Sequence, residues 1–163
     1  MKMSRLTRRC AVAAVAIVVA GLTAATPSAA ADSSFDFPAG TACAFALRVD
    51  VADVGNMAVR VSNNNRVISA GRNDTGTFVN VATGKTVTLT GKGSVLITTL
   101  NADGTTTITG LGHNVLILVP TDFPAGPSTT LYVGSVVTRV DARGNFTLLS
   151  HSGTTTDICA AIA

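Results

Sequence analysis

Residues 94–111 carry the sequence SVLITTLNADGTTTITGL, which is typical of two β-strands joined by a tight turn. Valine, isoleucine and threonine dominate both flanks, and β-branched side chains pack well on a pleated sheet. Between the flanks lies Asp103-Gly104, a pair that favours a hairpin because both residue types tolerate positive φ. We therefore expect strands over 94–100 and 105–111, with a turn at 101–104.

The same pattern extends outward along the chain. At 43–51 apolar and polar residues alternate, so that Leu47, Val49 and Val51 share one face. The run from Val115 to Val119 is apolar without interruption, which predicts a strand buried on both faces. The remaining expected strands cover 57–61, 66–70, 77–81, 86–90, 113–119, 129–140 and 146–151.

These segments predict an all-β fold. The chain contains 21 Thr after position 31, and no long apolar stripe with helical spacing precedes the C-terminus. We expect a single antiparallel domain over 32–163, built of roughly nine or ten short strands as an up-and-down barrel or a sandwich. At 156–163 we expect one or two helical turns, capped by Thr156 or Asp157.

The N-terminus has the layout of a secretory signal peptide. Lys2, Arg5, Arg8 and Arg9 precede an uncharged apolar run at 10–25, and small residues follow up to Ala31. The apolar run is shorter than the roughly 20 residues that a membrane helix needs. We expect residues 1–31 to be removed after Ala30 or Ala31, which leaves a secreted, extracellular protein without a transmembrane anchor.

The whole chain of 163 residues has a formal charge of +3, but this basicity belongs to the leader. After position 31 there are eight Lys and Arg against nine Asp and no Glu, a net charge of −1. Scattered cations and a single Tyr offer neither a phosphate-binding stripe nor stacking platforms, so we expect no nucleic-acid partner.

Two cysteines, Cys43 and Cys159, remain after the leader and lie near the two ends of the domain. In an oxidising compartment such a pair is expected to form a disulfide. Two thiols are too few for a cysteine-based metal site, and no phosphate-binding or dinucleotide fingerprint is present. We expect no metal and no cofactor.

The candidates for catalysis are His113, Asp122 and His151. One histidine acting as a base, with a carboxylate such as Asp122 fixing its tautomer, would give an acid–base site near the loop at 120–128. The alternative for each histidine is a position at the edge of a strand, hydrogen-bonded to the backbone. No serine lies in a G-x-S-x-G setting.

Three segments carry a resemblance to other proteins: GHNVLIL at 112–118, PTDFPAGPSTTLYVG at 120–134 and TDIC at 156–159. With the leader and the Thr/Val/Gly/Ala bias, they resemble a group of uncharacterised small exported β-rich proteins of filamentous soil bacteria. The resemblance implies export, a paired set of cysteines and an all-β domain. It implies no activity and no site residues.

The sequence therefore predicts a secreted, non-catalytic binding or structural β-module whose ligand is a small molecule, a glycan or a protein. The alternative is a small β-barrel enzyme, a hydrolase or cyclase, that uses His113 and Asp122 with His151 or Tyr132. A third possibility is an interior pocket for an apolar small molecule.

Overall fold

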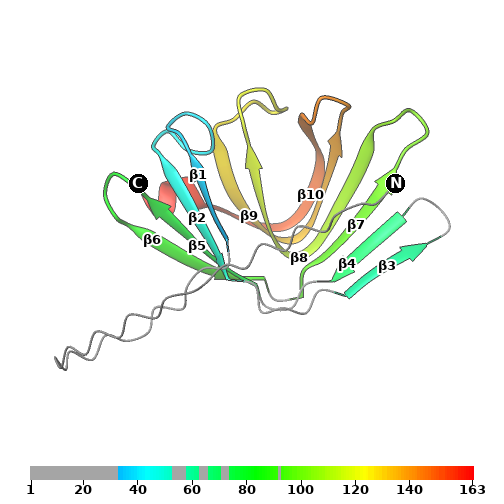
Figure 1. Cartoon of the computed structure of the whole chain (residues 1–163), viewed down its shortest axis with the longest axis horizontal. Helices are drawn as coiled ribbons and strands as arrows, with labels where there is room; N and C mark the ends of the chain where they lie inside the picture. The colour runs from blue at the N-terminus through cyan, green and yellow to red at the C-terminus, as the bar shows by residue number, and fades with distance from the viewer. Residues whose placement is uncertain (1–32, 53–57, 63–65, 71–73, 92) are drawn as a thin grey trace, which may run out of the picture.

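The computed structural model describes residues 33–52, 58–62, 66–70, 74–91 and 93–163, so the expected leader at 1–31 lies outside the described residues. The described chain forms ten strands and one short helix (Figure 1). Their bounds are β1 Ser33–Phe37, β2 Leu47–Ala52, β3 Ala58–Ser62, β4 Arg66–Ala70, β5 Thr75–Asn80, β6 Thr86–Thr90, β7 Val95–Leu100, β8 Thr106–Leu118, β9 Ser128–Val140, β10 Phe146–Asp157 and α1 Ile158–Ala161.

The strands form two antiparallel sheets, which confirms the all-β prediction. The smaller sheet has the order β1-β2-β5-β6 and the larger has the order β10-β9-β8-β7-β4-β3. In Figure 1 the smaller sheet lies on the left and strands β7, β4 and β3 lie on the right. Of the two expected architectures, this arrangement is the sandwich-like one, because the described strands belong to two separate sheets and do not close into one.

Strand β8 corrects one expectation. The segments 105–111 and 113–119 were expected to be two strands, but Thr106–Leu118 is one strand that bends at Gly112. Gly112 lies opposite Gly134 of β9, which in turn lies opposite Gly153 of β10. All three have positive φ, a backbone conformation that glycine adopts without a steric penalty. This glycine row lets the three long strands curve together through the lower part of Figure 1.

The main hydrophobic core lies between the smaller sheet and one arm of the bent sheet. Leu47 and Val49 of β2 and Phe78 of β5 pack with Ile158 of α1 and with Ile162. Partly buried side chains of β8 and β9, Ile117 and Leu131, complete the cluster. The alternation expected at Leu47 and Val49 is therefore the pattern that faces the core.

A second group of buried side chains lies on the opposite face of β9. Tyr132, Val136 and Thr138 are buried there, while Thr129 is buried on the face toward the main core. Leu118 and Asp122 are also buried. Strand β9 thus has buried side chains on both faces, whereas Val115 in the apolar run of β8 is 38% exposed.

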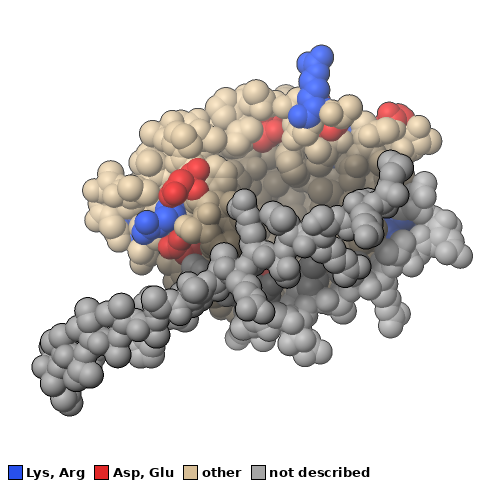
Figure 2. Space-filling model, in the orientation of Figure 1, with Lys and Arg blue, Asp and Glu red and all other residues tan. Residues whose placement is uncertain are grey.

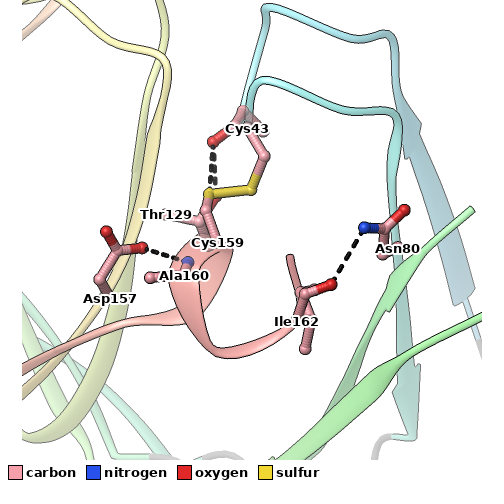
Figure 3. Close-up of a disulfide and its surroundings, with 8 residues drawn as sticks. Cys43, Asn80, Thr129, Asp157, Cys159, Ala160 and Ile162 are labelled. Atoms are coloured by element: carbon pink, nitrogen blue, oxygen red, sulfur yellow. Dashed lines mark hydrogen bonds between the residues drawn. A yellow bond between two sulfur atoms is a disulfide. The ribbon is translucent and has the colours of Figure 1, made fainter. Parts of the chain in front are cut away.

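The C-terminal helix is held in the core by a disulfide and two hydrogen-bonded side chains (Figure 3). Cys43 and Cys159 are bonded with their Cα atoms 5.6 Å apart, which confirms the predicted pair. Asp157 caps the helix by accepting a hydrogen bond from the Ala160 amide at 3.0 Å. Asn80 Nδ2 donates to the Ile162 carbonyl oxygen at 3.0 Å.

Candidate functional site

A cleft of about 220 Å³ lies between the two sheets. Its walls come from β2, β5 and β6 of the smaller sheet and from β8 and β9 of the larger one. The apolar part of the lining consists of Val51, Phe78, Leu89, Val115 and Leu131. The polar part consists of Asp74, Thr90, Ser94, His113 and Asn114. The cleft therefore combines an apolar surface with a small set of hydrogen-bonding groups, as ligand sites do.

Two glycines help to keep this space open. Gly76 lies in β5 between Val51 and Leu89 on the neighbouring strands. A Cβ atom at Gly76 would lie 3.3 Å from the Phe78 ring. Gly91 also lines the cleft, and its amide donates to the Asp74 carbonyl oxygen at 2.8 Å. The walls of the cleft thus lack side chains at these two positions.

Two polar side chains of the cleft, Ser94 and Asn114, donate hydrogen bonds to the main chain. The Ser94 hydroxyl donates to the carbonyl oxygen of His113. Asn114 Nδ2 donates to the Leu111 carbonyl oxygen at 2.8 Å. In the described part of the chain, the His113 imidazole has no hydrogen-bond partner. Ser94 and Asn114 therefore stabilise the bent strand, and the His113 imidazole is available to a ligand, with Asp74 and Thr90 also lining the cleft.

Asp122 lies elsewhere and has a different role from the expected one. It is 7% exposed, and its two carboxylate oxygens accept hydrogen bonds from the Val119 amide at 2.6 Å and the Phe146 amide at 2.7 Å. The carboxylate thereby ties the loop at 120–127 to the start of β10. Both oxygens are used by backbone donors, so Asp122 acts as a structural bracket for this loop.

His151 also lies away from the cleft. Its ring meets the Tyr132 ring edge to face, with centroids 5.4 Å apart and an interplanar angle of 61°. Burial raises the pKa of Tyr132 above its ordinary value of 10.0. Within the described structure, His113, Asp122 and His151 lie in three separate surroundings, and the expected pairing of His113 with Asp122 is not formed.

The cleft contains residues that the sequence did not indicate. Asp74 directly precedes β5 and carries no motif, and Phe78 and Leu89 come from strands that are distant from His113 in the sequence. The sequence pattern does predict that His113, Val115 and Ile117 share a face, because they occupy alternate positions of one strand. Which strands oppose that face depends on the packing of the two sheets.

The described residues contain no group of three or more His, Cys, Asp or Glu side chains able to hold a metal ion. None of the described helices is long and apolar enough to span a membrane. Figure 2 shows one face of the molecule, on which the basic side chains stand apart with acidic ones near them.

Comparison with family models, curated proteins and solved structures gave no match for this chain.

Proposed function

We propose that this protein is an exported, non-catalytic binding module that holds a small, largely apolar molecule between its two sheets. The observation that carries this proposal is the cleft of about 220 Å³ with five apolar lining side chains and the accessible His113 imidazole. Drug-sized ligands occupy pockets of about 300–1,000 Å³, so the cleft suits a smaller compound of one or two rings.

Export is supported by the disulfide and by the sequence of the leader. Cys43 and Cys159 are paired, and disulfides of this kind persist in oxidising compartments. The basic and apolar segments before Ala31 have the order of a signal peptide. A binding module outside the cell would meet small molecules from the medium.

The local chemistry favours binding over catalysis. A nucleophilic hydroxyl needs a base within hydrogen-bond reach, but the Ser94 hydroxyl donates to a main-chain carbonyl instead. Asp122, the carboxylate expected to orient a histidine, is occupied by two backbone amides. The cleft thus presents the His113 imidazole beside an apolar wall, where it can orient a polar group of a ligand.

A hydrolase or cyclase is the second candidate, and one observation favours it. The cleft is lined by both His113 and Asp74, a base and a carboxylate in one open site. Should His113→Ala abolish a turnover measured with substrates from the culture medium, the enzyme would replace the binding module.

Titration of the ¹⁵N-labelled protein with indole, followed by NMR, tests the binding proposal. We expect saturable shifts of amides at Gly76, Leu89 and Val115. Val115→Phe fills the cleft and should weaken indole binding at least about 10-fold, equivalent to 1.4 kcal/mol. Val81→Phe is the matched control, because Val81 is 54% exposed and lies outside the lining. Equal binding by the two variants, or no saturation, would contradict the proposal.

A further inference from the structure

Among the described strands, β10 leaves a long free edge on the larger sheet. It is the last strand in the order β10-β9-β8-β7-β4-β3, and β9 is the strand that pairs along it. Nine consecutive residues of β10, 149–157, are exposed. The other edge strands, β1, β3 and β6, have five residues each. An unprotected edge of this length is a template for pairing with another strand.

Both ends of this free edge are defined by the fold. At the start of β10 the loop at 120–127 covers the edge. The Phe123 amide donates to the Phe146 carbonyl oxygen at 2.8 Å, and the Leu148 amide donates to the Phe123 carbonyl oxygen at 2.7 Å. At the end of β10, helix α1 begins at Ile158. The free segment therefore runs from 149 to 157, and its middle residue is Gly153.

Gly153 restricts what can pair there. It is the last member of the glycine row, and a Cβ atom on it would lie 2.1 Å from the Val133 carbonyl oxygen. At Gly134 the corresponding distance to the Ser152 carbonyl oxygen is 2.3 Å. At the bend, β9 and β10 thus approach each other closely with a glycine opposite a glycine. A strand that continues the sheet beyond β10 must follow the same bend, and it fits best with a glycine opposite Gly153.

A second copy of β10 meets this requirement. We propose that the chain forms a two-fold symmetric dimer in which the β10 strands of two copies pair antiparallel around Gly153. The two-fold axis of this dimer runs perpendicular to the sheet. The β10 strands of both copies then bend toward the same face, so the two larger sheets join into one continuous sheet. Such an interface is self-complementary, because each contact occurs twice.

The side chains of the segment suit this pairing. Around Gly153, Ser152 faces Thr154 of the partner subunit, and Ser150 faces Thr156 of the partner subunit. Hydroxyl pairs of this kind already exist across strands of this chain, at Ser135–Ser152 (2.8 Å) and Thr77–Thr88 (3.1 Å). The charged residue of the segment, Asp157, lies at the opposite end of this pairing from Asp157 of the partner subunit, so no like charges oppose each other.

Sedimentation velocity on the purified, disulfide-bonded protein, from about 1 µM to about 1 mM, tests the dimer. We expect a monomer–dimer equilibrium in the unmodified chain. Ser150→Lys/Thr156→Lys places a lysine opposite a lysine twice and should weaken the dimer at least about 10-fold. Ser150→Lys/Thr156→Asp is the matched control, since the same lysine then faces an aspartate and the dimer should persist or strengthen.

Both altered side chains are exposed, so the two variants should melt as the unmodified protein does. A chain that stays monomeric up to about 1 mM would overturn the proposal. So would a dimer whose strength is the same in both variants, because its interface would then lie elsewhere.

Discussion

The Asn80 side-chain amide and the Ile162 carbonyl oxygen are joined by a hydrogen bond of 3.0 Å inside the main core. Asn80 is 3% exposed and Ile162 is 1% exposed. The same Asn80 side chain also accepts hydrogen bonds from the amides of Ala82 and Thr83 through its Oδ1 atom. One residue of β5 therefore stabilises both the following turn and the position of the C-terminal tail.

Replacement of Asn80 by alanine should lower the free energy of unfolding by about 2–3 kcal/mol, because buried partners lose their hydrogen bonds. Urea unfolding monitored by circular dichroism measures the change. Thr86→Ala, on the exposed face of the adjacent strand β6, should cost less than about 1 kcal/mol. A similar loss in both variants would contradict the role assigned to Asn80.

Removal of the disulfide with Cys43→Ala/Cys159→Ala should destabilise the fold strongly. The two cysteines are 116 positions apart, and a closed loop of that size restricts the unfolded chain by about 4–5 kcal/mol in the chain-entropy model. We expect the Tm to fall by more than about 10 °C in calorimetry. Labelling of Cys43 or Cys159 by a thiol reagent in the untreated native protein would refute the bridge.

Gly153→Ala, with Gly144→Ala as its control, tests whether the bend of β10 requires a glycine. Both glycines have a φ of 88°, but a Cβ atom at Gly153 would collide with backbone, whereas at Gly144 it would meet nothing within 4 Å. Alanine should cost about 1 kcal/mol at Gly144 for its positive φ. It should cost at least about 2 kcal/mol more at Gly153, measured by urea unfolding. Equal costs would mean that the sheet relaxes freely at the bend.

The pKa of Asp141 should respond to Asn145. The side-chain amide of Asn145 is the main cause that holds the pKa of the Asp141 carboxyl below its ordinary value of 3.8, and the Asn145 and Arg143 amides also donate to it. Because the folded-state pKa is the lower one, this contribution to stability is complete above about pH 4 and is lost as the pH falls through the folded-state pKa.

In a ¹³C-carboxyl NMR titration, Asn145→Ala should therefore raise the pKa of Asp141 toward 3.8. The Tm should also fall less between pH 5 and pH 3 than in the unmodified protein, by roughly the contribution of this one carboxylate. An unchanged titration of Asp141 would show that the side-chain amide of Asn145 does not set its pKa.

Asp122→Ala separates a structural role from a catalytic one. Loss of the two hydrogen bonds to the Val119 and Phe146 amides should destabilise the protein by about 2–3 kcal/mol, since bonds to a charged acceptor are the stronger kind. Indole binding in the cleft should not change, because Asp122 does not line it. A loss of ligand binding without loss of stability would instead place Asp122 in the functional site.

Much of the local structure could be predicted because its causes are local. The hairpin at 101–104 follows from Asp103-Gly104, and Gly104 does have a positive φ. Asp157 was one of two expected caps for the C-terminal helix and is the one used. The disulfide followed from the number of cysteines. Strand β1 was missed because the sequence SSFDF at 33–37 is short, and its place depends on pairing with β2.

The candidate site could not be predicted because its parts meet only through the packing of the two sheets. His113 was singled out as a polar side chain at the start of a strand, whereas it lies within β8, and its neighbours in the cleft come from β2, β5, β6 and β9. Asp122 lies nine positions further along the chain, and its carboxylate binds two nearby backbone amides instead. The sequence alone does not show that backbone amides compete with His113 for the Asp122 carboxylate.

The Cys43–Cys159 bond also makes a covalent ring of most of the protein. Nine of the ten described strands, β2 to β10, lie between the two cysteines. A protease that cuts once in an exposed hairpin, such as the one at Asp103, therefore leaves a single covalent molecule whose pieces remain in register. Outside a cell, where chain cleavage is frequent, this protein would keep its mass and its cleft after a nick that would split an unlinked chain in two.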